Sequence, residues 1–186
     1  MRKLGVFNFI SLDGYYKGLH DDISWNTHTQ ENSDFSAENL KAGSTLLFGR
    51  VTYEMMFSFW PSPMAYERMP LVAEGMNKAE KIVFSRTLKK AEWQNTRLIK
   101  DNMVEEIKKM KQLPGKDLTL LGSGSVLTQL ADAGLIDEYA IMLNPVALGA
   151  GTSVFKNLKQ QLNLKLTGTR TFKSGSVLLT YSPAKI

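Results

Sequence analysis

The chain has 186 residues, of which 43% are hydrophobic, a formal net charge of +5 and no cysteine. This length predicts a single domain, residues 1–186, that buries about two-thirds of its unfolded surface on folding. The lack of cysteine excludes disulfides, thiol catalysis and cysteine-bound metal, and it favours a reducing, cytoplasmic location.

Membrane and nucleic-acid partners are disfavoured by the same sequence. No stretch reaches the ~18 apolar residues of a membrane span, and the charged start of the chain reads as part of a first strand rather than a signal peptide. The lysines are dispersed without interleaved aromatic residues, so no nucleic acid is expected as a partner. The positive charge favours small anionic ligands instead. The two histidines, His20 and His28, are more typical of solvated loop residues than of a metal site.

Residues 4–12 form an apolar run with β-branched and aromatic members, which predicts a strand buried on both faces. The run ends at Asp13-Gly14. A carboxylate directly after a buried strand lies where α/β proteins place chemistry, although Asp-Gly is also a common turn pair. Residues 15–33 are polar without a sustained period, and they predict a long loop of the kind that is often functional.

A short helix is expected at residues 34–43, with Ser33 or Asp34 as its N-cap and Gly43 as its C-cap. The chain then alternates between apolar runs that predict strands and segments that predict helices. The strands are expected at residues 44–48, 80–84, 98–99 and 118–121, and the helices at residues 53–59, 103–112 and 127–134. This alternation is typical of an α/β protein with a mostly parallel sheet.

The segment after residues 118–121 is Gly122-Ser123-Gly124-Ser125. A strand, a tight glycine loop and a helix in this order have the geometry of a phosphate site, because glycines let the backbone approach an anion and the first N–H groups of the helix carry the positive end of its dipole. Serine hydroxyls can bond to the same anion. The motif lacks the third glycine of the dinucleotide fingerprint and the lysine of a P-loop. The alternative is a tight turn in which Ser125 is the N-cap.

The last third of the chain changes character. Residues 136–143 alternate in part and predict a strand, and a second glycine loop follows at residues 148–152. Residues 162–172 and 176–181 alternate and are joined by a short polar turn with a glycine, which predicts an antiparallel hairpin. The expected fold class is α/β, with a mostly parallel central sheet, helices on both faces and a C-terminal antiparallel hairpin.

Three predicted strand ends carry groups that suit an anion. They are Gly49-Arg50-Val51-Thr52, Ser85-Arg86-Thr87 and Gly122-Ser123-Gly124-Ser125. Because the ends of parallel strands converge on one edge of a sheet, these groups are expected to meet at a single crevice. Arginine binds phosphate bidentately, so two arginines and a glycine-rich helix start suit a dinucleotide with an additional phosphate.

This pattern resembles the dihydrofolate reductase-like superfamily, and within it the reductase domain of bacterial riboflavin biosynthesis proteins, the RibD C-terminal domain, with its stand-alone relatives. The resemblance covers nearly the whole chain and implies a three-layer fold. The motifs that carry it are Ile10-Ser11-Leu12-Asp13-Gly14, Phe48-Gly49-Arg50-Val51-Thr52-Tyr53-Glu54, Leu121-Gly122-Ser123-Gly124 and Asn144-Pro145-Val146-Ala147-Leu148-Gly149-Ala150-Gly151. The first and the last are more similar to the riboflavin branch than to true folate reductases.

The resemblance implies NADPH as the cofactor and assigns each of the three strand ends to a part of it. Gly49, Arg50 and Thr52 would lie on its phosphates, Ser85 and Arg86 would hold the adenosine 2′-phosphate, and Gly122, Ser123, Gly124 and Ser125 would cradle the pyrophosphate. Gly18, seven residues before Trp25, is similar to the glycine of the mobile loop beside the nicotinamide in folate reductases.

Two aspartates are candidate catalytic residues. Asp13 would accept a hydrogen bond from the substrate or relay a proton, and its alternative role is that of a turn former. Asp34 lies sixteen residues before Arg50, near the place of the pterin-binding acid of folate reductases, and its alternative role is that of a helix N-cap. A carboxylate in an apolar pocket can have a raised pKa and act as an acid.

The activity that the resemblance implies is an NADPH-dependent reduction of a C=N or C=O bond in a small heterocyclic substrate, similar to that of 5-amino-6-(5-phosphoribosylamino)uracil reductase of riboflavin biosynthesis. The alternatives are a dihydrofolate reductase-type activity and a nucleotide-binding protein without turnover. A basic nucleic-acid-binding module is a further, disfavoured alternative. Relatives with this architecture commonly pair, so a homodimer is expected.

Overall fold

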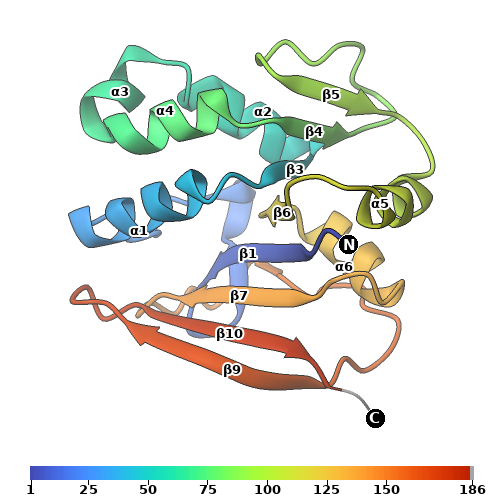
Figure 1. Ribbon diagram of the computed structural model, residues 1–186. Helices are drawn as coiled ribbons and strands as arrows, with labels where there is room; N and C mark the ends of the chain where they lie inside the picture. The colour runs from blue at the N-terminus through green and yellow to red at the C-terminus, as the bar shows by residue number, and fades with distance from the viewer. Residues whose placement is uncertain (185–186) are drawn as a thin grey trace.

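The computed structural model describes residues 1–184 (Figure 1). Its centre is an eight-stranded sheet in the order β5-β4-β3-β6-β1-β7-β10-β9, and β2 and β8 form a separate two-stranded sheet. The strands are β1 (Leu4–Ile10), β2 (Tyr15–Lys17), β3 (Thr45–Gly49), β4 (Lys81–Phe84), β5 (Thr96–Ile99), β6 (Leu118–Leu121), β7 (Glu138–Leu143), β8 (Thr152–Ser153), β9 (Leu164–Thr171) and β10 (Val177–Pro183).

The neighbouring strands from β5 to β7 all run parallel. The remaining pairings, β7 with β10 and β10 with β9, are antiparallel. The β9–β10 hairpin turns near Gly175, whose φ of +84° is in the left-handed region that glycine tolerates. The expected mostly parallel sheet and the C-terminal hairpin are both confirmed.

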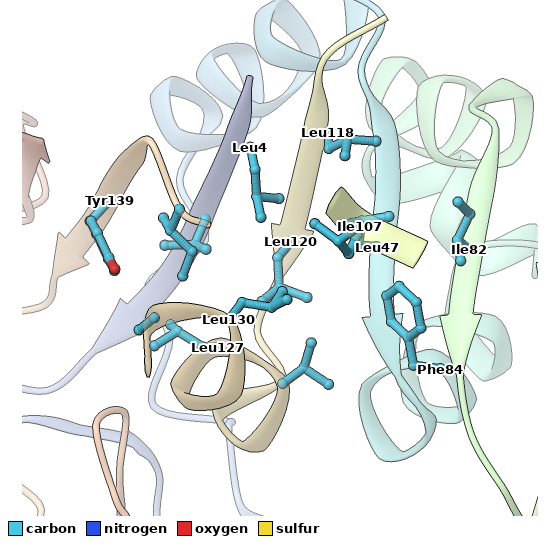
Figure 2. Close-up of a cluster of buried hydrophobic side chains, with 14 of the residues drawn as sticks. Leu4, Leu47, Ile82, Phe84, Ile107, Leu118, Leu120, Leu127, Leu130 and Tyr139 are labelled. Carbon is cyan, nitrogen blue, oxygen red and sulfur yellow. The ribbon is translucent and has the colours of Figure 1, made fainter. Parts of the chain in front are cut away.

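Helices cover both faces of the large sheet. The helical segments of residues 1–184 are η1 (Leu19–Asp21), α1 (Gln30–Lys41), α2 (Arg50–Phe59), α3 (Pro63–Arg68), α4 (Pro70–Lys78), α5 (Met103–Gln112) and α6 (Gly124–Asp132). On one face, Ile107 of α5 and Leu127 of α6 pack in a cluster with the strand residues Leu47 and Leu120 (Figure 2). Helices α1, α2 and α4 bury their apolar side chains against the other face. The three-layer α/β fold class is confirmed.

No helix within residues 1–184 has the length and the apolar content to cross a membrane.

The first long helix begins earlier than the sequence pattern predicts. Helix α1 begins at Gln30, and its N-cap is Thr29, whose hydroxyl accepts a hydrogen bond from the N–H of Asn32 at 3.3 Å. The prediction that Ser33 or Asp34 caps this helix is therefore wrong, because the threonine one turn earlier satisfies the orphan N–H group. The long loop predicted at residues 15–33 also contains β2 and η1.

Two short helices between residues 61 and 79 were not predicted. Proline opens both of them, Pro63 in α3 and Pro70 in α4. Proline reads as a stop signal in sequence, but at the first position of a helix it costs no hydrogen bond because its missing N–H would be unpaired there. Helix α2 begins at Arg50 rather than at Tyr53, directly after β3.

Candidate functional site

Helices α2 and α6 begin at the carboxyl ends of neighbouring parallel strands, β3 and β6. Gly49 is the N-cap of α2 and Ser123 is the N-cap of α6, and neither residue caps its helix with a side-chain hydrogen bond. The first N–H groups of both helices therefore lack intrahelical acceptors, and both dipoles turn their positive ends to one edge of the sheet. This arrangement suits an anion with more than one phosphate group. The alternative with Ser125 as the N-cap is wrong, because α6 already begins at Gly124.

Both glycines of the loop before α6 are closely approached by neighbouring side chains. Gly122 has a φ of +57°, and a Cβ atom on it would lie 3.2 Å from Cγ2 of Thr52. A Cβ atom on Gly124 would lie 3.0 Å from the ring of Tyr16. A side chain at either position would meet these neighbours, which explains both glycines, and the N–H of Gly122 already donates to the carbonyl of Phe7 at 3.1 Å. The N–H groups of Gly124 and Ser125, in the first turn of α6, fit a phosphate of a dinucleotide.

The hydroxyls of Ser123 and Ser85 are used inside the protein. The Ser123 hydroxyl accepts a hydrogen bond from the N–H of Gly49 at 2.8 Å and donates one to the carbonyl of Leu121 at 3.1 Å. The Ser85 hydroxyl accepts hydrogen bonds from the N–H groups of Leu88 at 2.9 Å and Thr87 at 3.2 Å. Both serines thus hold the shape of their loops. Their expected contacts with a cofactor stay predictions.

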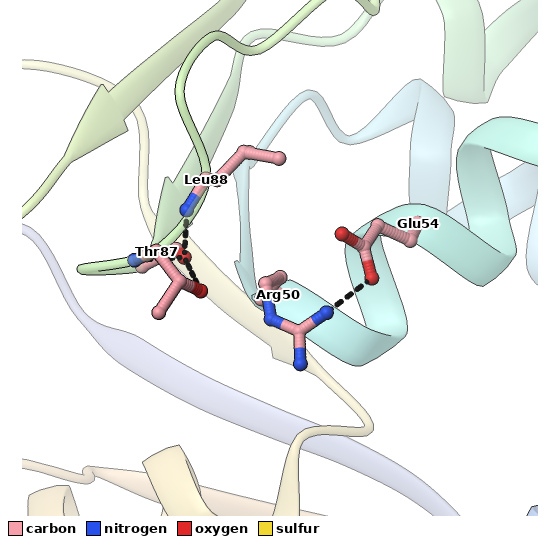
Figure 3. Close-up of polar contacts among 5 residues, drawn as sticks. Arg50, Glu54, Thr87 and Leu88 are labelled. Carbon is pink, nitrogen blue, oxygen red and sulfur yellow. Dashed lines mark hydrogen bonds and ion pairs between the residues drawn. The ribbon is translucent and has the colours of Figure 1, made fainter.

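Three basic side chains line the same edge of the sheet. Arg50 pairs with Glu54 on the next turn of α2 at 2.7 Å (Figure 3). Arg86 and Lys100 follow the ends of β4 and β5, two strands that pair side by side, and both are exposed. Among the ion pairs of residues 1–184, neither Arg86 nor Lys100 takes part. Two cations without a carboxylate partner are therefore available to an anionic group.

These groups line one open groove of about 2020 Å³. The groove also reaches residues at the amino ends of the strands, Lys3 and Asp117 among them, so only part of this volume lies beside the glycine loop. Away from the glycine loop, its wall includes Phe9 and Phe35 and then Asn26, His28 and Asn32, in and before the first turn of α1. The groove therefore joins a polar, anion-friendly part to a part that is aromatic and amide-lined.

Asp13 is not among the residues that line the groove. Its carboxylate accepts hydrogen bonds from the N–H of Gly149 at 2.7 Å, from the N–H of Leu148 at 3.1 Å and from the hydroxyl of Ser11 at 2.6 Å. These bonds lower the pKa of Asp13 to about 2, and the bond from Ser11 has the largest effect. The carboxylate is therefore ionised near neutral pH and joins the turn after β1 to the second glycine loop, and its role in catalysis stays a prediction.

Asp34 and Gly18 also lie away from the groove wall. Asp34 is exposed on α1, where its carboxylate accepts a hydrogen bond from the amide of Gln30 at 2.8 Å. Gly18 donates its N–H to the carbonyl of Asp22 at 2.8 Å. Its neighbour Lys17 does line the groove. The structure thus brings together the predicted phosphate-binding residues, but it does not bring either aspartate to them.

Sequence reasoning missed several residues that line the groove. Lys100 follows a strand that was recognised only over two residues, and Asn26 and Asn32 were part of the segment read as a loop. His28 is exposed in the loop before α1, as predicted, although it also lines the groove and partial desolvation lowers its pKa. A titratable group with a shifted pKa in a cleft is a signal of a functional site, but that signal appears only in the folded protein.

Known proteins resemble this chain along nearly all of its length. At the sequence level it is 33% identical over 174 residues to the uncharacterized protein YyaP of Bacillus subtilis, covering 92% of this chain and 90% of that protein. A solved structure from Shewanella sp. PV-4, described as a riboflavin biosynthesis protein, matches with a TM-score of 0.76 and 21% identity over 98% of this chain and 99% of that one.

A second solved structure is a bifunctional enzyme of Thermotoga maritima. Its name is diaminohydroxyphosphoribosylaminopyrimidine deaminase/5-amino-6-(5-phosphoribosylamino)uracil reductase, and it matches with a TM-score of 0.68 and 15% identity. The match covers 98% of this chain and 57% of the enzyme, so this chain corresponds to one part of it. At this level of identity the two structures show a shared fold.

The family model described as the RibD C-terminal domain matches residues 2–178. Together with the parallel sheet, the C-terminal hairpin and the glycine loop between β6 and α6, this match over nearly the whole sequence establishes that the chain belongs to the RibD C-terminal domain family.

Proposed function

We propose that this protein is an NADPH-dependent reductase of a small heterocyclic substrate. The observation that carries the proposal is the meeting of two helix N-termini, those of α2 and α6, at a glycine cradle beside two unpaired cations. A nucleotide-binding site of this kind on a parallel sheet lies outside the carboxyl ends of the strands, where the starts of α2 and α6 lie here.

Different residues of the chain would bind the different phosphate groups of NADPH. The N–H groups at the starts of α2 and α6 would hold the pyrophosphate, with Arg50 and Thr52 beside it. Arg86 and Lys100 would hold the 2′-phosphate, since a guanidinium binds phosphate bidentately and an ammonium adds a point charge. NADPH supplies a hydride when it is bound, and the protein's contribution is to orient the two reactants and exclude water.

The substrate would lie on the aromatic part of the groove, over Phe9 and Phe35. A planar heterocycle suits such a wall because aromatic rings favour stacked or edge-on contacts. The reductase activity in the name of the Thermotoga enzyme supports a pyrimidine as the substrate class. Family membership supports the same reaction type for this chain.

A homodimer is part of this proposal. Leu166 on the edge strand β9 has an exposed fraction of 49%, and an apolar residue on an exposed edge strand is available to a second copy. Static light scattering on the purified protein measures the molecular mass directly and separates a dimer from a monomer.

The activity is tested by following the loss of nicotinamide absorbance when the protein, NADPH and a panel of aminopyrimidines and pterins are mixed. Turnover on a pyrimidine supports the proposal, and turnover on dihydropterins alone would favour the folate reductase alternative. Tight NADPH binding without oxidation of NADPH on any member of the panel would leave a nucleotide-binding protein without turnover.

A further inference from the structure

Helix α2 exposes apolar side chains to the groove. Val51 and Met55 have exposed fractions of 52% and 36%, and the half-buried Phe59 follows one turn later. Residues four apart lie on the same side of a helix, so these three side chains form one stripe, the α2 stripe, and all three line the groove. Apolar side chains that gather exposed in a cleft indicate a binding site, because their contact with water is unfavourable.

The far end of the α2 stripe is held by contacts within the chain. The indole N–H of Trp60 donates a hydrogen bond to Sδ of Met56 at 3.0 Å, and the ring of Trp60 lies edge-on to that of Phe59 at a centroid distance of 5.0 Å. Met56 and Trp60 also line the groove, and both pack against the buried cluster on this face of the sheet. The apolar wall is therefore built on the core, and Met55 adds a flexible side chain that can adapt to a ligand.

Charged side chains are missing from this wall. In the described part of the chain, α1 lines the groove only with uncharged residues, and so does α2 beyond Arg50. Arg50 is paired with Glu54, which does not line the groove. Helix α1 contributes amides and hydroxyls together with the apolar side chains of Phe35 and Leu40. A phosphate group on this wall would lose its hydration without gaining a counter-ion, which is unfavourable.

The next cation after the α2 stripe in the sequence is Arg68, the last residue of α3. It is exposed and also lines the groove. Lys17 lines the groove from β2, but it is paired with Asp21. A phosphorylated substrate would therefore depend on Arg68, whereas a neutral one would not.

We propose that the α2 stripe determines the substrate specificity of the groove, and that the substrate is an uncharged molecule whose planar ring carries an apolar substituent instead of a phosphorylated sugar. The substituent would lie on Val51, Met55 and Phe59, and the amides and hydroxyls of α1 would bond to neutral polar groups of the substrate. The inference rests on the proposed function for the cofactor and the reacting ring, and it adds the chemical class of the rest of the substrate. It separates this protein from the Thermotoga enzyme, whose name specifies a phosphoribosyl compound.

Two probes with the same ring and different charge test the proposal. They are 1-naphthol, which is neutral near pH 7, and 1-naphthyl phosphate. Both are titrated by calorimetry into wild-type protein saturated with NADPH, so that the phosphate-binding groups beside the glycine loop are occupied. We expect 1-naphthol to bind at least about tenfold more tightly, because the phosphate would be desolvated on an apolar wall. Equal or tighter binding of 1-naphthyl phosphate, or no binding of 1-naphthol, would overturn the proposal.

Variants of Met55 locate the bound probe. Met55→Leu keeps an apolar side chain and should bind 1-naphthol as the wild type does, whereas Met55→Lys places a cation on the wall. We expect Met55→Lys to weaken 1-naphthol by about tenfold and to strengthen 1-naphthyl phosphate, with NADPH affinity unchanged. Both variants should fold, because Met55 is exposed and both new residues favour helix. Undiminished binding of 1-naphthol to Met55→Lys would contradict the assignment.

Two further variants serve as controls. Met64 has an exposed fraction of 50% and lies outside the groove wall, so Met64→Lys should change the affinity of neither probe. Arg68→Ala should leave the binding of 1-naphthol unchanged. A wild type that prefers 1-naphthyl phosphate and loses this preference in Arg68→Ala would assign the groove to phosphorylated substrates and overturn the proposal.

Failure of this inference is distinguishable from failure of the proposed function. Titration of the wild type with NADPH alone reports on the cofactor, and the effect of Met55→Lys on 1-naphthol binding without NADPH reports on the α2 stripe. A protein that does not bind NADPH but binds 1-naphthol through Met55 would overturn the first and support the second.

Discussion

The hydroxyl of Ser123 accepts a hydrogen bond from the backbone N–H of Gly49 at 2.8 Å, and this contact joins the start of α6 to the start of α2. The two residues are 74 positions apart in the sequence. Because each is the N-cap of its helix, the bond fixes the distance between two positive helix ends. The spacing of the phosphate-binding groups thus depends on one buried serine.

Replacement of this serine should loosen the site. Ser123→Ala removes a buried hydrogen bond, so we expect a loss of about 1 kcal/mol in the free energy of unfolding and weaker NADPH binding by roughly tenfold. Urea denaturation and fluorescence titration measure the two effects. Ser125→Ala, two residues away and exposed, is the matched control and should change stability by less than about 0.5 kcal/mol. If Ser123→Ala binds NADPH as tightly as the wild type does, the hydrogen bond between Ser123 and Gly49 does not determine the geometry of the cofactor site.

Arg86 and Lys100 should make the affinity of the protein for NADPH higher than its affinity for NADH. Loss of a charge-assisted hydrogen bond costs about 1.5–3 kcal/mol, so Arg86→Ala should weaken NADPH by roughly 10- to 100-fold and NADH much less. Lys100→Ala should do the same to a smaller extent, because ammonium makes no bidentate contact. Lys89→Ala, an exposed lysine outside the groove wall, serves as the control. Equal losses for the two cofactors in the Arg86 variant would remove this residue from the 2′-phosphate.

Gly122 should not tolerate substitution by a residue with a side chain. Its φ of +57° strains other residues, and an added Cβ would lie 3.2 Å from Cγ2 of Thr52. Gly122→Ala should therefore lower the free energy of unfolding by about 1–2 kcal/mol and impair NADPH binding. Thr52→Ser in the same chain removes the opposing methyl group and should recover part of the stability. If Gly122→Ala binds NADPH normally, the glycine loop lies outside the cofactor site.

Asp13 should contribute to acid stability rather than to turnover. Its pKa is lowered from 3.8 to about 2 in the folded protein, so the unfolded chain binds more protons in this range. The stabilisation is therefore complete above the unfolded pKa and is lost as the pH falls through the folded pKa. Thermal unfolding of Asp13→Asn between neutral pH and about pH 2 should show a shallower acid decline than the wild type.

Turnover of the same variant at neutral pH is the second readout, and it separates acid stabilisation from a catalytic role. Loss of turnover in Asp13→Asn at neutral pH, with the fold intact, would return Asp13 to the catalytic residues.

The sequence predicts those parts of the site that depend on local order. Gly122-Ser123-Gly124 stands between an apolar run and an amphipathic segment, and this succession alone places a glycine loop at a helix start. Arg86 is predicted for the same reason, because it follows Ser85, the first polar residue after a buried strand. The alternation of strands and helices likewise fixes the parallel sheet.

The surroundings of the two aspartates could not be predicted, because they come from distant segments or from the start of a helix. The N–H groups that bind the Asp13 carboxylate belong to residues 135 and 136 positions later in the chain. Whether Asp34 faces a pocket depends on where α1 begins, and Thr29 sets that start. Which apolar side chains of α2 line the groove is likewise a property of packing, since only the folded chain shows which of them stay exposed.

Titration of the purified protein with NADPH and NADH, read by nicotinamide fluorescence and by thermal stability, shows whether the groove binds a dinucleotide and prefers the one with the 2′-phosphate. A ligand that binds only the folded state raises its stability by an amount set by the ratio of concentration to dissociation constant. We expect micromolar-range binding of NADPH, tighter than that of NADH, with a matching rise in the unfolding temperature. Binding of neither nucleotide would contradict the proposed function, because the glycine cradle and the two cations would then have another role.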